Sequence, residues 1–135
     1  MTLWYRAPEV LLGTTYATPV DIWSCGCILA ELVTRRPLFP GLTETDQLTK
    51  IFSVLGLPGE ESWPQDSQVL RQNFSNHQRA MGFSNISEID ADGQDLLERL
   101  LRFEPGLRMT ACEALKHPFF RECGPSPHDT SRCRA

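Results

Sequence analysis

Hydrophobic positions along the chain fall into stretches that predict helices separated by loops. The most apolar stretch is residues 22–30, in which only Ser24 is clearly polar. Thr18 is a suitable N-cap and Pro19 a suitable first helical residue, so we predict a helix from residue 20 to about residue 34. A helix that is apolar nearly all round is expected to run through the middle of a protein. A membrane span is rejected, because the run is far shorter than about 20 residues and acidic residues flank it.

Two shorter helices are predicted on either side of this apolar stretch. Pro8 can open a short helix that Gly13 stops. Further along, Thr43 can cap a helix that Gly56 closes. The hydrophobic residues of that helix follow the i, i+3, i+4, i+7 spacing and are Leu48, Ile51, Phe52 and Leu55. It is therefore expected to bury one face and expose the other.

The last third of the chain predicts two more helices. One covers roughly residues 92–102, with its leucines on one face and Pro105 ending it. The other begins at Thr110, whose hydroxyl and Glu113 three residues on have the sequence of a capping box. It stops near His117. We interpret His117 as a helix-end residue, favourable near the negative end of the helix dipole, and assign it no catalytic role.

Between residues 58 and 89 no hydrophobic period survives. Pro, Ser, Asn, Gln and Gly accumulate there around three isolated aromatic residues, Trp63, Phe74 and Phe83. Long irregular loops in compact domains usually carry function, so an insertion with a binding role is expected. The sequence contains no convincing strand, hairpin or repeat signal, and the predicted fold class is mainly α.

Composition then narrows the function. The 135 residues include 17 acidic and 13 basic side chains, a formal charge of −4, which argues against nucleic-acid or membrane binding driven by net charge. Five cysteines and no hydrophobic N-terminal signal region favour a reducing, intracellular compartment and free thiols. No metal site is expected, because Cys25 and Cys27 point to different sides of a helix and the other cysteines lack paired spacing.

Four motifs in order resemble one family. They are T-L-W-Y-R-A-P-E at residues 2–9, D-I-W-S-C-G-C at residues 21–27, R-P-L-F-P-G at residues 36–41, and Arg108 ahead of H-P-F-F at residues 117–120. Together they resemble the C-terminal lobe of cyclin-dependent protein kinases. Residues 16–21 and 56–64 are most similar to the subgroup that works with D-type cyclins. The resemblance implies a partial protein kinase domain over residues 1–121. The tail over residues 122–135, with its prolines and scattered charge, is predicted to be disordered.

The family's catalytic groups are missing from this sequence. A eukaryotic kinase needs a Gly-rich loop, a strand lysine, a catalytic-loop Asp and Asn, and a metal-binding D-F-G. The sequence has no Gly-x-Gly and no His-Arg-Asp, Asp92-Gly93 lacks the Phe between them, and the only lysines are Lys50 and Lys116 on predicted helices. We therefore expect no catalytic residue and no bound ATP or Mg²⁺ in this chain, although the complete family domain uses both.

The resemblance also implies roles for particular residues. The positions of Leu3, Trp4 and Arg6 shape the family's pocket for the proline that follows the phosphorylated residue. Proline has no backbone N–H to donate. A pocket without a hydrogen-bond acceptor therefore leaves no N–H unpaired when proline binds, whereas any other residue would bury an unpaired N–H. The alternative is that Trp4 and Tyr5 only pack on the helix that starts near Thr18.

Three charged residues match structural positions of the family. Glu9 and Arg108 match an ion pair that ties the activation segment to the lower lobe; otherwise they are two unrelated surface charges. Asp21 matches a buried aspartate that accepts hydrogen bonds from the catalytic loop. That loop is missing, so we expect a carboxylate without donors, at a cost of about 1–3 kcal/mol. The same truncation is expected to leave the chain partly molten or aggregation-prone, exposing Ile22, Ile28 and Leu29.

Two hypotheses for function stay open. The first is a partial cyclin-dependent Ser/Thr kinase. By family, its substrates are proteins that contain Ser/Thr-Pro, and the kinase itself is found in the nucleus and cytoplasm. The second is a non-catalytic binding module that engages substrates or kinase accessory subunits. Trp63 matches the region where the family contacts such subunits, and its alternative role is packing under the preceding helix. Cyclin binding is expected to be weak or absent, and an unrelated helical interaction domain is hard to reconcile with four motifs in order.

Overall fold

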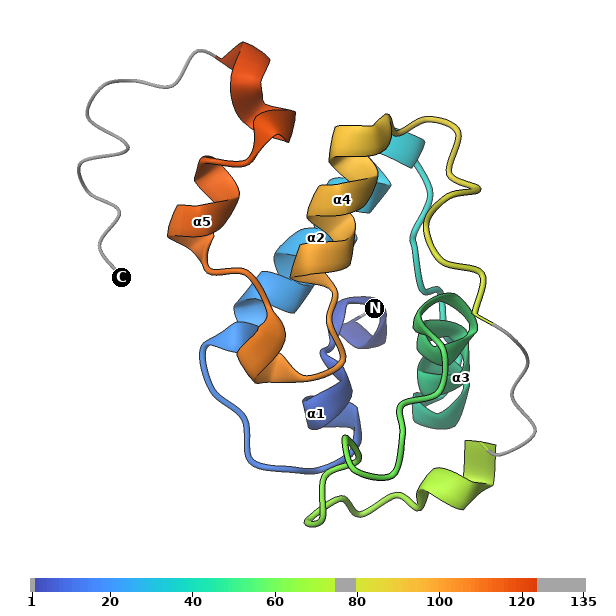
Figure 1. Ribbon diagram of the computed structural model, residues 1–135. Helices are drawn as coiled ribbons and strands as arrows, with labels where there is room; N and C mark the ends of the chain where they lie inside the picture. The colour runs from blue at the N-terminus through green and yellow to red at the C-terminus, as the bar shows by residue number, and fades with distance from the viewer. Residues whose placement is uncertain (1, 75–79, 124–135) are drawn as a thin grey trace.

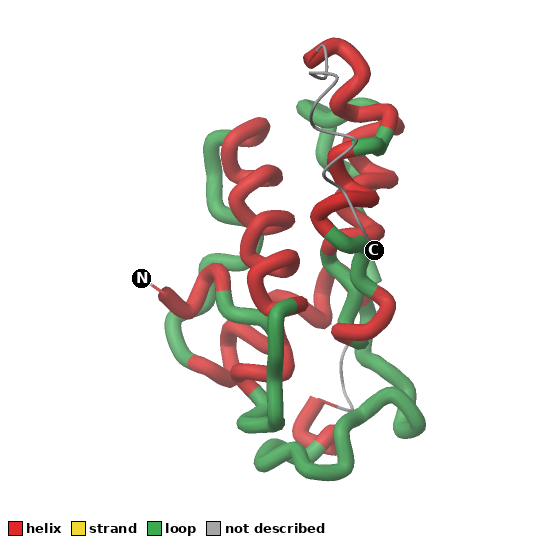
Figure 2. Tube along the Cα trace, turned by 90° about the vertical axis from the view of Figure 1, so that its left-hand side faces the viewer, coloured by secondary structure: helices red, strands yellow, loops and turns green. Residues whose placement is uncertain are grey.

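The structure is a computed structural model that describes residues 2–74 and 80–123. Its α-helices and 3₁₀-helices alternate with loops, and the described residues contain no strand (Figure 2). This agrees with the predicted mainly α fold. The α-helices are α1 (Pro8–Leu11), α2 (Pro19–Thr34), α3 (Glu44–Leu55), α4 (Ala91–Leu100) and α5 (Ala111–Leu115), and the 3₁₀-helices are η1 (Thr2–Tyr5), η2 (Arg71–Phe74), η3 (Pro105–Leu107) and η4 (Pro118–Cys123).

Helix α2 lies at the centre of the molecule and packs against α4, η1 and η3 (Figure 1). Gly26 makes the close approach to α4 possible, because a Cβ at this position would lie 2.8 Å from Leu101 Cδ2. The side of α2 that faces its neighbours also buries Trp23, Cys27 and Ala30. These residues form one hydrophobic core with the leucines of α4.

Helix α2 is not buried all round, and the exposure expected for Ile28 is observed. Ile28 is 48% exposed and Leu32 is 73% exposed, and Cys25 on the same side is also exposed. Ile22 and Leu29 are half-buried and pack against the edge of the core. The physical reason is that the described elements cover only one face of this apolar helix, so its other face meets solvent.

The predicted N-cap is confirmed at two helices and wrong at a third. The Thr43 side chain accepts a hydrogen bond from the Asp46 amide at the start of α3, and Thr110 forms the predicted capping box. Thr18 precedes α2 as predicted, but it has helical backbone angles and its side chain makes no capping bond. Helix α4 begins one residue earlier than expected, because Asp90 caps it through the Gly93 amide at 2.8 Å.

The irregular region between α3 and α4 is anchored to the end of α3. The Met81 amide donates to the Ser53 carbonyl and the Gly82 amide to the Val54 carbonyl, both at 2.9 Å. These carbonyls belong to the last turn of α3, which has no further helical turn to satisfy them.

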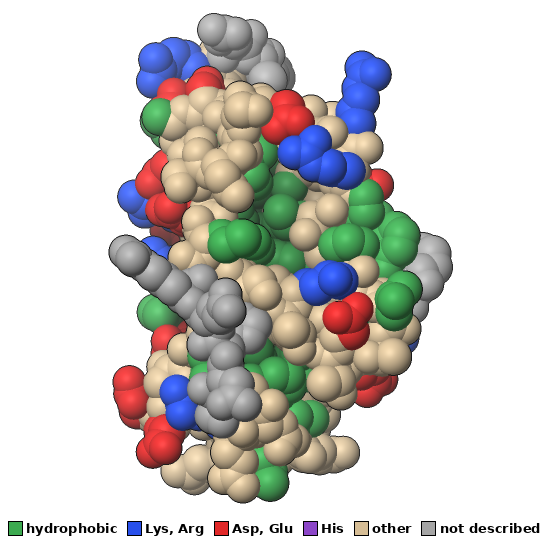
Figure 3. All heavy atoms as spheres, turned by 90° about the vertical axis from the view of Figure 1, so that its right-hand side faces the viewer, with side chains coloured by type: hydrophobic (Ala, Val, Ile, Leu, Met, Phe, Trp, Pro, Cys, Tyr) green, Lys and Arg blue, Asp and Glu red, His purple; other side chains and the backbone are tan. Residues whose placement is uncertain are grey.

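On the side of the molecule viewed in Figure 3, exposed hydrophobic side chains lie among charged side chains of both signs.

The end of the chain is only partly described. Residues 124–135 lie outside the described residues, and so does most of the tail that was predicted to be disordered. The first two residues of that predicted tail belong to η4. Cys25, Cys27 and Cys112 are free thiols, as predicted, and the other two cysteine side chains are not among those described.

Candidate functional site

The segment Leu3–Arg6 lies against the start of α3. The Trp4 indole donates its Nε1 hydrogen to the Gly41 carbonyl at 3.0 Å, and an Arg6 nitrogen lies 3.8 Å from a Glu44 carboxylate oxygen. Leu3 is half-buried against the hydrophobic core. Of the three residues to which the resemblance gives a substrate-pocket role, Leu3 and Trp4 therefore lie on η1 and Arg6 directly follows it, next to the start of α3.

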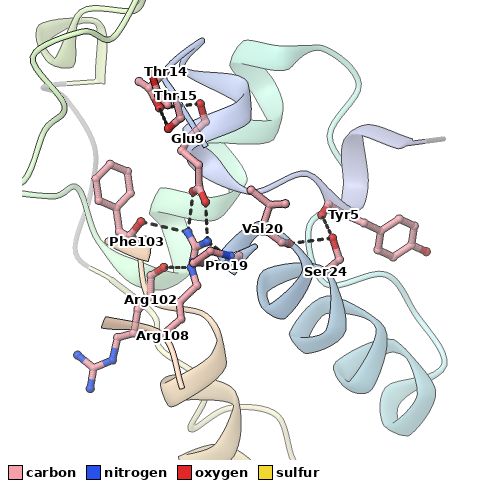
Figure 4. A network of polar contacts seen from close by, with 10 residues as sticks. All are labelled: Tyr5, Glu9, Thr14, Thr15, Pro19, Val20, Ser24, Arg102, Phe103 and Arg108. Atoms are coloured by element: carbon pink, nitrogen blue, oxygen red, sulfur yellow. Dashed lines mark hydrogen bonds and ion pairs between the residues drawn. The ribbon is translucent and has the colours of Figure 1, made fainter. Parts of the chain in front are cut away.

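Helix α2 holds the same segment from the other side. The Tyr5 hydroxyl donates to Glu31 Oε1 at 2.6 Å. The Ser24 hydroxyl donates to the Tyr5 carbonyl at 2.8 Å, as Figure 4 shows. Donation to the Glu31 carboxylate, together with partial burial, raises the pKa of the Tyr5 hydroxyl above its ordinary value. Sequence reasoning missed these bonds, although Ser24 stood out as the polar residue in an apolar run. Together with the bond from Trp4 to Gly41, they hold η1 from both sides.

Glu9 and Arg108 form the predicted ion pair. Nη1 and Nη2 of Arg108 each lie 2.7 Å from a Glu9 carboxylate oxygen, and the two side chains are only 1% and 4% exposed. The remaining guanidinium hydrogens go to the backbone carbonyls of Arg102, Phe103 and Pro19 at 2.8, 3.2 and 3.0 Å (Figure 4). All five N–H donors of Arg108 therefore have acceptors. The pair joins α1 to the loop before α5.

Among the described residues, the Asp21 carboxylate lacks hydrogen-bond donors, as predicted. Its side chain is exposed in the first turn of α2, and no described group donates a hydrogen bond to it. The expected desolvation cost therefore does not apply, because water can solvate an exposed carboxylate. The predicted lack of donors is therefore confirmed and only its cost is wrong, since no described element covers this side of α2.

Trp63 belongs to an aromatic cluster. Its ring centroid lies 5.8 Å from that of Phe52, 6.2 Å from Phe74 and 5.9 Å from Phe103, and its indole donates to the Val69 carbonyl at 3.1 Å. These contacts support the packing role that was weighed against partner binding. Contact with an accessory subunit stays a prediction.

His117 has a role that sequence reasoning missed. Its ring is buried, and the Phe119 amide donates to Nδ1 at 3.1 Å, so Nδ1 carries no hydrogen. Nε2 therefore carries the ring hydrogen and donates to Asp95 Oδ2 at 2.7 Å. This bond, with help from Arg99, holds the pKa of Asp95 below its ordinary value. His117 thus links the turn after α5 to α4, and only its position before Pro118 hinted at a structural role.

Two features of the described residues bear on ATP and Mg²⁺. No group of three or more His, Cys, Asp or Glu side chains among the described residues could hold a metal ion. A cavity of about 480 Å³ between the ends of α3 and α4 is mostly apolar, and its charged residues are Glu98, Glu104 and Arg102. Two carboxylates disfavour a polyphosphate by charge repulsion.

Within the described ranges, no helix is long and apolar enough to cross a membrane.

Comparison with known proteins identifies the family. Residues 1–120 match the protein kinase domain family, so the chain belongs to the protein kinase family, and its helical architecture is consistent with the C-terminal lobe of such a kinase. The chain is similar to the "Cyclin-dependent kinase 4" of Xenopus laevis, with 52% identity over 139 aligned residues that cover the whole chain. The chain spans 44% of the length of that relative. It is thus a relative of cyclin-dependent kinases.

Proposed function

We propose that this chain carries the substrate-presenting part of a cyclin-dependent Ser/Thr protein kinase and transfers no phosphate by itself. The observation that carries the proposal is the segment Leu3–Arg6, held by α3 through Gly41 and by α2 through Glu31. A surface that must select one residue type has to be held in one shape, because discrimination depends on what it excludes as much as on what it binds. The substrates of the complete kinase are proteins in cell-cycle control with Ser or Thr followed by Pro.

The sequence supports the proposed lack of catalysis. Phosphoryl transfer consists almost entirely of positioning and charge stabilisation by the Gly-rich loop, the strand lysine, the catalytic Asp and the metal-binding Asp. The sequence contains none of their motifs. The chain alone therefore binds neither ATP nor Mg²⁺ productively, and ATP-dependent transfer belongs to the complete domain. By family, its compartment is the nucleus and cytoplasm. Its affinity for a cyclin is weak or absent, because cyclin binding in the family relies mainly on the small lobe and the activation segment.

A second candidate is a non-catalytic module that binds substrates or kinase accessory subunits. The exposed apolar side of α2, with Ile28 and Leu32, favours this candidate, because such surfaces commonly mark interaction sites. Replacing Trp63 by Ala separates its two roles. Lost partner binding with intact folding supports direct contact, whereas damaged folding with intact partner binding supports packing alone.

A radiolabelled-ATP assay tests the proposal. The purified chain is incubated with a Ser-Pro substrate beside a full-length relative with its cyclin. We expect incorporation by the relative and none by the chain. Turnover by the chain, free of contaminating kinase, overturns the proposal. In the same preparation, binding of a Ser-Pro peptide is compared with binding of its Ser-Ala counterpart. The chain is expected to prefer the peptide with proline.

A further inference from the structure

Gly41 connects the proposed substrate segment to α3. Its carbonyl accepts from Trp4 Nε1 at 3.0 Å, and its amide donates to Gln47 Oε1 at 2.9 Å. A Cβ at position 41 would lie only 2.6 Å from Gln47 Cα, so the close approach requires glycine. Gly41 therefore contacts both Gln47 and the indole of Trp4, through the two peptide groups that flank its Cα.

Stability alone does not explain Gln47. Its side chain is fully buried, and its Nε2 donor has no hydrogen-bond partner among the described residues. An unpaired buried donor is unfavourable, and an apolar side chain of similar shape would avoid it. The Gly41 amide does not depend on Gln47 either, because it also reaches the Phe39 carbonyl at 3.0 Å. What Gln47 provides is a fixed peptide group on the N-terminal side of the Gly41 Cα, whose carbonyl lies in the next peptide group.

The neighbouring residue of α3 holds the same loop. Asp46 Oδ2 accepts from the Leu42 amide at 2.9 Å, so two consecutive side chains of α3 bind two consecutive amides of the loop. Asp46 is half-exposed, whereas Gln47 is enclosed. The Gly41 carbonyl that accepts from Trp4 shares its peptide plane with the Leu42 amide that Asp46 holds, and Gln47 fixes the preceding peptide plane, so the two side chains orient this carbonyl together.

We propose that Gln47 is a positioning residue for substrate recognition. Acting through Gly41, it orients the Trp4 indole and thereby sets the shape of the surface that accepts the proline of a Ser/Thr-Pro substrate. This inference rests on the proposed function. Gln47 itself touches no substrate, because its side chain is 0% exposed.

The test uses the Gln47→Met variant, which removes the acceptor and the unpaired donor while keeping a similar volume. Leu48→Met, a buried change in the same turn of α3, is the matched control. Nitrogen-15 spectra of the tryptophan indoles provide the first readout. We expect the Trp4 indole proton of Gln47→Met to shift and to exchange with solvent about fivefold faster, the factor for one ordinary hydrogen bond. The Trp63 indole, which donates to Val69, is the internal reference and stays unchanged.

Peptide binding provides the second readout. The preference of the wild type for a Ser-Pro over a Ser-Ala peptide is expected to fall about fivefold in Gln47→Met and to persist in Leu48→Met. An unchanged Trp4 indole, or an unchanged preference in Gln47→Met, overturns the inference and leaves the proposed function standing. A wild type without any preference for proline overturns the proposed function and the inference with it.

Discussion

The bond between Glu9 and Arg108 is the interaction whose loss we expect to matter most. Replacing Glu9 by Gln removes the negative charge and places an amide donor against a guanidinium that has only donors. Both side chains are almost completely enclosed, at 4% and 1% exposed, so water cannot replace the lost carboxylate. Breaking one partner of a buried pair typically costs about 3–5 kcal/mol. A small domain has about 5–15 kcal/mol of stability in total, so this variant loses a large fraction of it.

Urea titration measures the effect. Far-UV circular dichroism and tryptophan fluorescence are followed together, so that coincident transitions establish two-state behaviour. Fluorescence reports locally as well, because the Arg108 guanidinium lies 5.1 Å from the centre of the Trp23 ring. Glu9→Gln is expected to move the midpoint strongly to lower urea. Arg108→Lys is also expected to destabilise, because one ammonium cannot reach acceptors that a planar fork with five donors satisfies.

An exposed pair provides the control. Arg36 Nη1 lies 2.8 Å from Glu88 Oε2, a distance close to that of the buried pair, but these two side chains are 62% and 35% exposed. Such a pair contributes about 0–1 kcal/mol, so Glu88→Gln should leave the midpoint nearly unchanged. The reasoning is refuted if Glu9→Gln and Glu88→Gln destabilise the chain by the same small amount.

Three further predictions concern pH, thiol chemistry and surface. The depressed pKa of Asp95 means that its contact with His117 stabilises the fold above the ordinary pKa of 3.8 and is lost as the pH falls through the lower folded value. Asp95→Asn should therefore flatten the acid side of a plot of urea midpoint against pH; an unchanged slope contradicts this. Burial raises the pKa of the Cys27 thiol to about 12, so iodoacetamide at pH 8 should modify exposed Cys25 far faster, as peptide mass spectrometry measures. Equal rates would argue against an enclosed thiol. Finally, the chain should bind a dye specific for apolar surface, and Leu32→Gln should lower the signal. A sharp melt without dye binding by the wild type would exclude that exposed surface.

Sequence reasoning worked best where the physics is local. The caps at Thr43 and Thr110 were predicted because a capping bond joins residues three apart, and both residues of each bond stand together in the sequence. The same reasoning failed at Thr18, whose backbone is already helical. The predicted start of α4 at Asp92 is one residue late, because the N-cap is Asp90 and the helix therefore begins at Ala91.

The candidate site was predicted in part, and the resemblance to a family supplied that part. Periodicity says nothing about Glu9 and Arg108, which are 99 positions apart, and their pairing was expected only because both match family positions. The bonds from Tyr5 to Glu31 and from His117 to Asp95 join separate elements and were missed. Neither has a sequence signal beyond a polar residue in an apolar setting.

The amino-acid order alone therefore determined the helical content, most helix ends and membership of the kinase family. Tertiary structure decided which side of α2 is buried, which charges are paired, and how Gly41 joins Trp4 to Gln47. The physical reason is range. Helix formation and capping depend on residues within about four positions of each other, whereas burial and ion pairing depend on which distant segments the fold brings together. The exposed Asp21 illustrates this, because its surroundings depend on elements that pack on α2 and not on its neighbours in sequence.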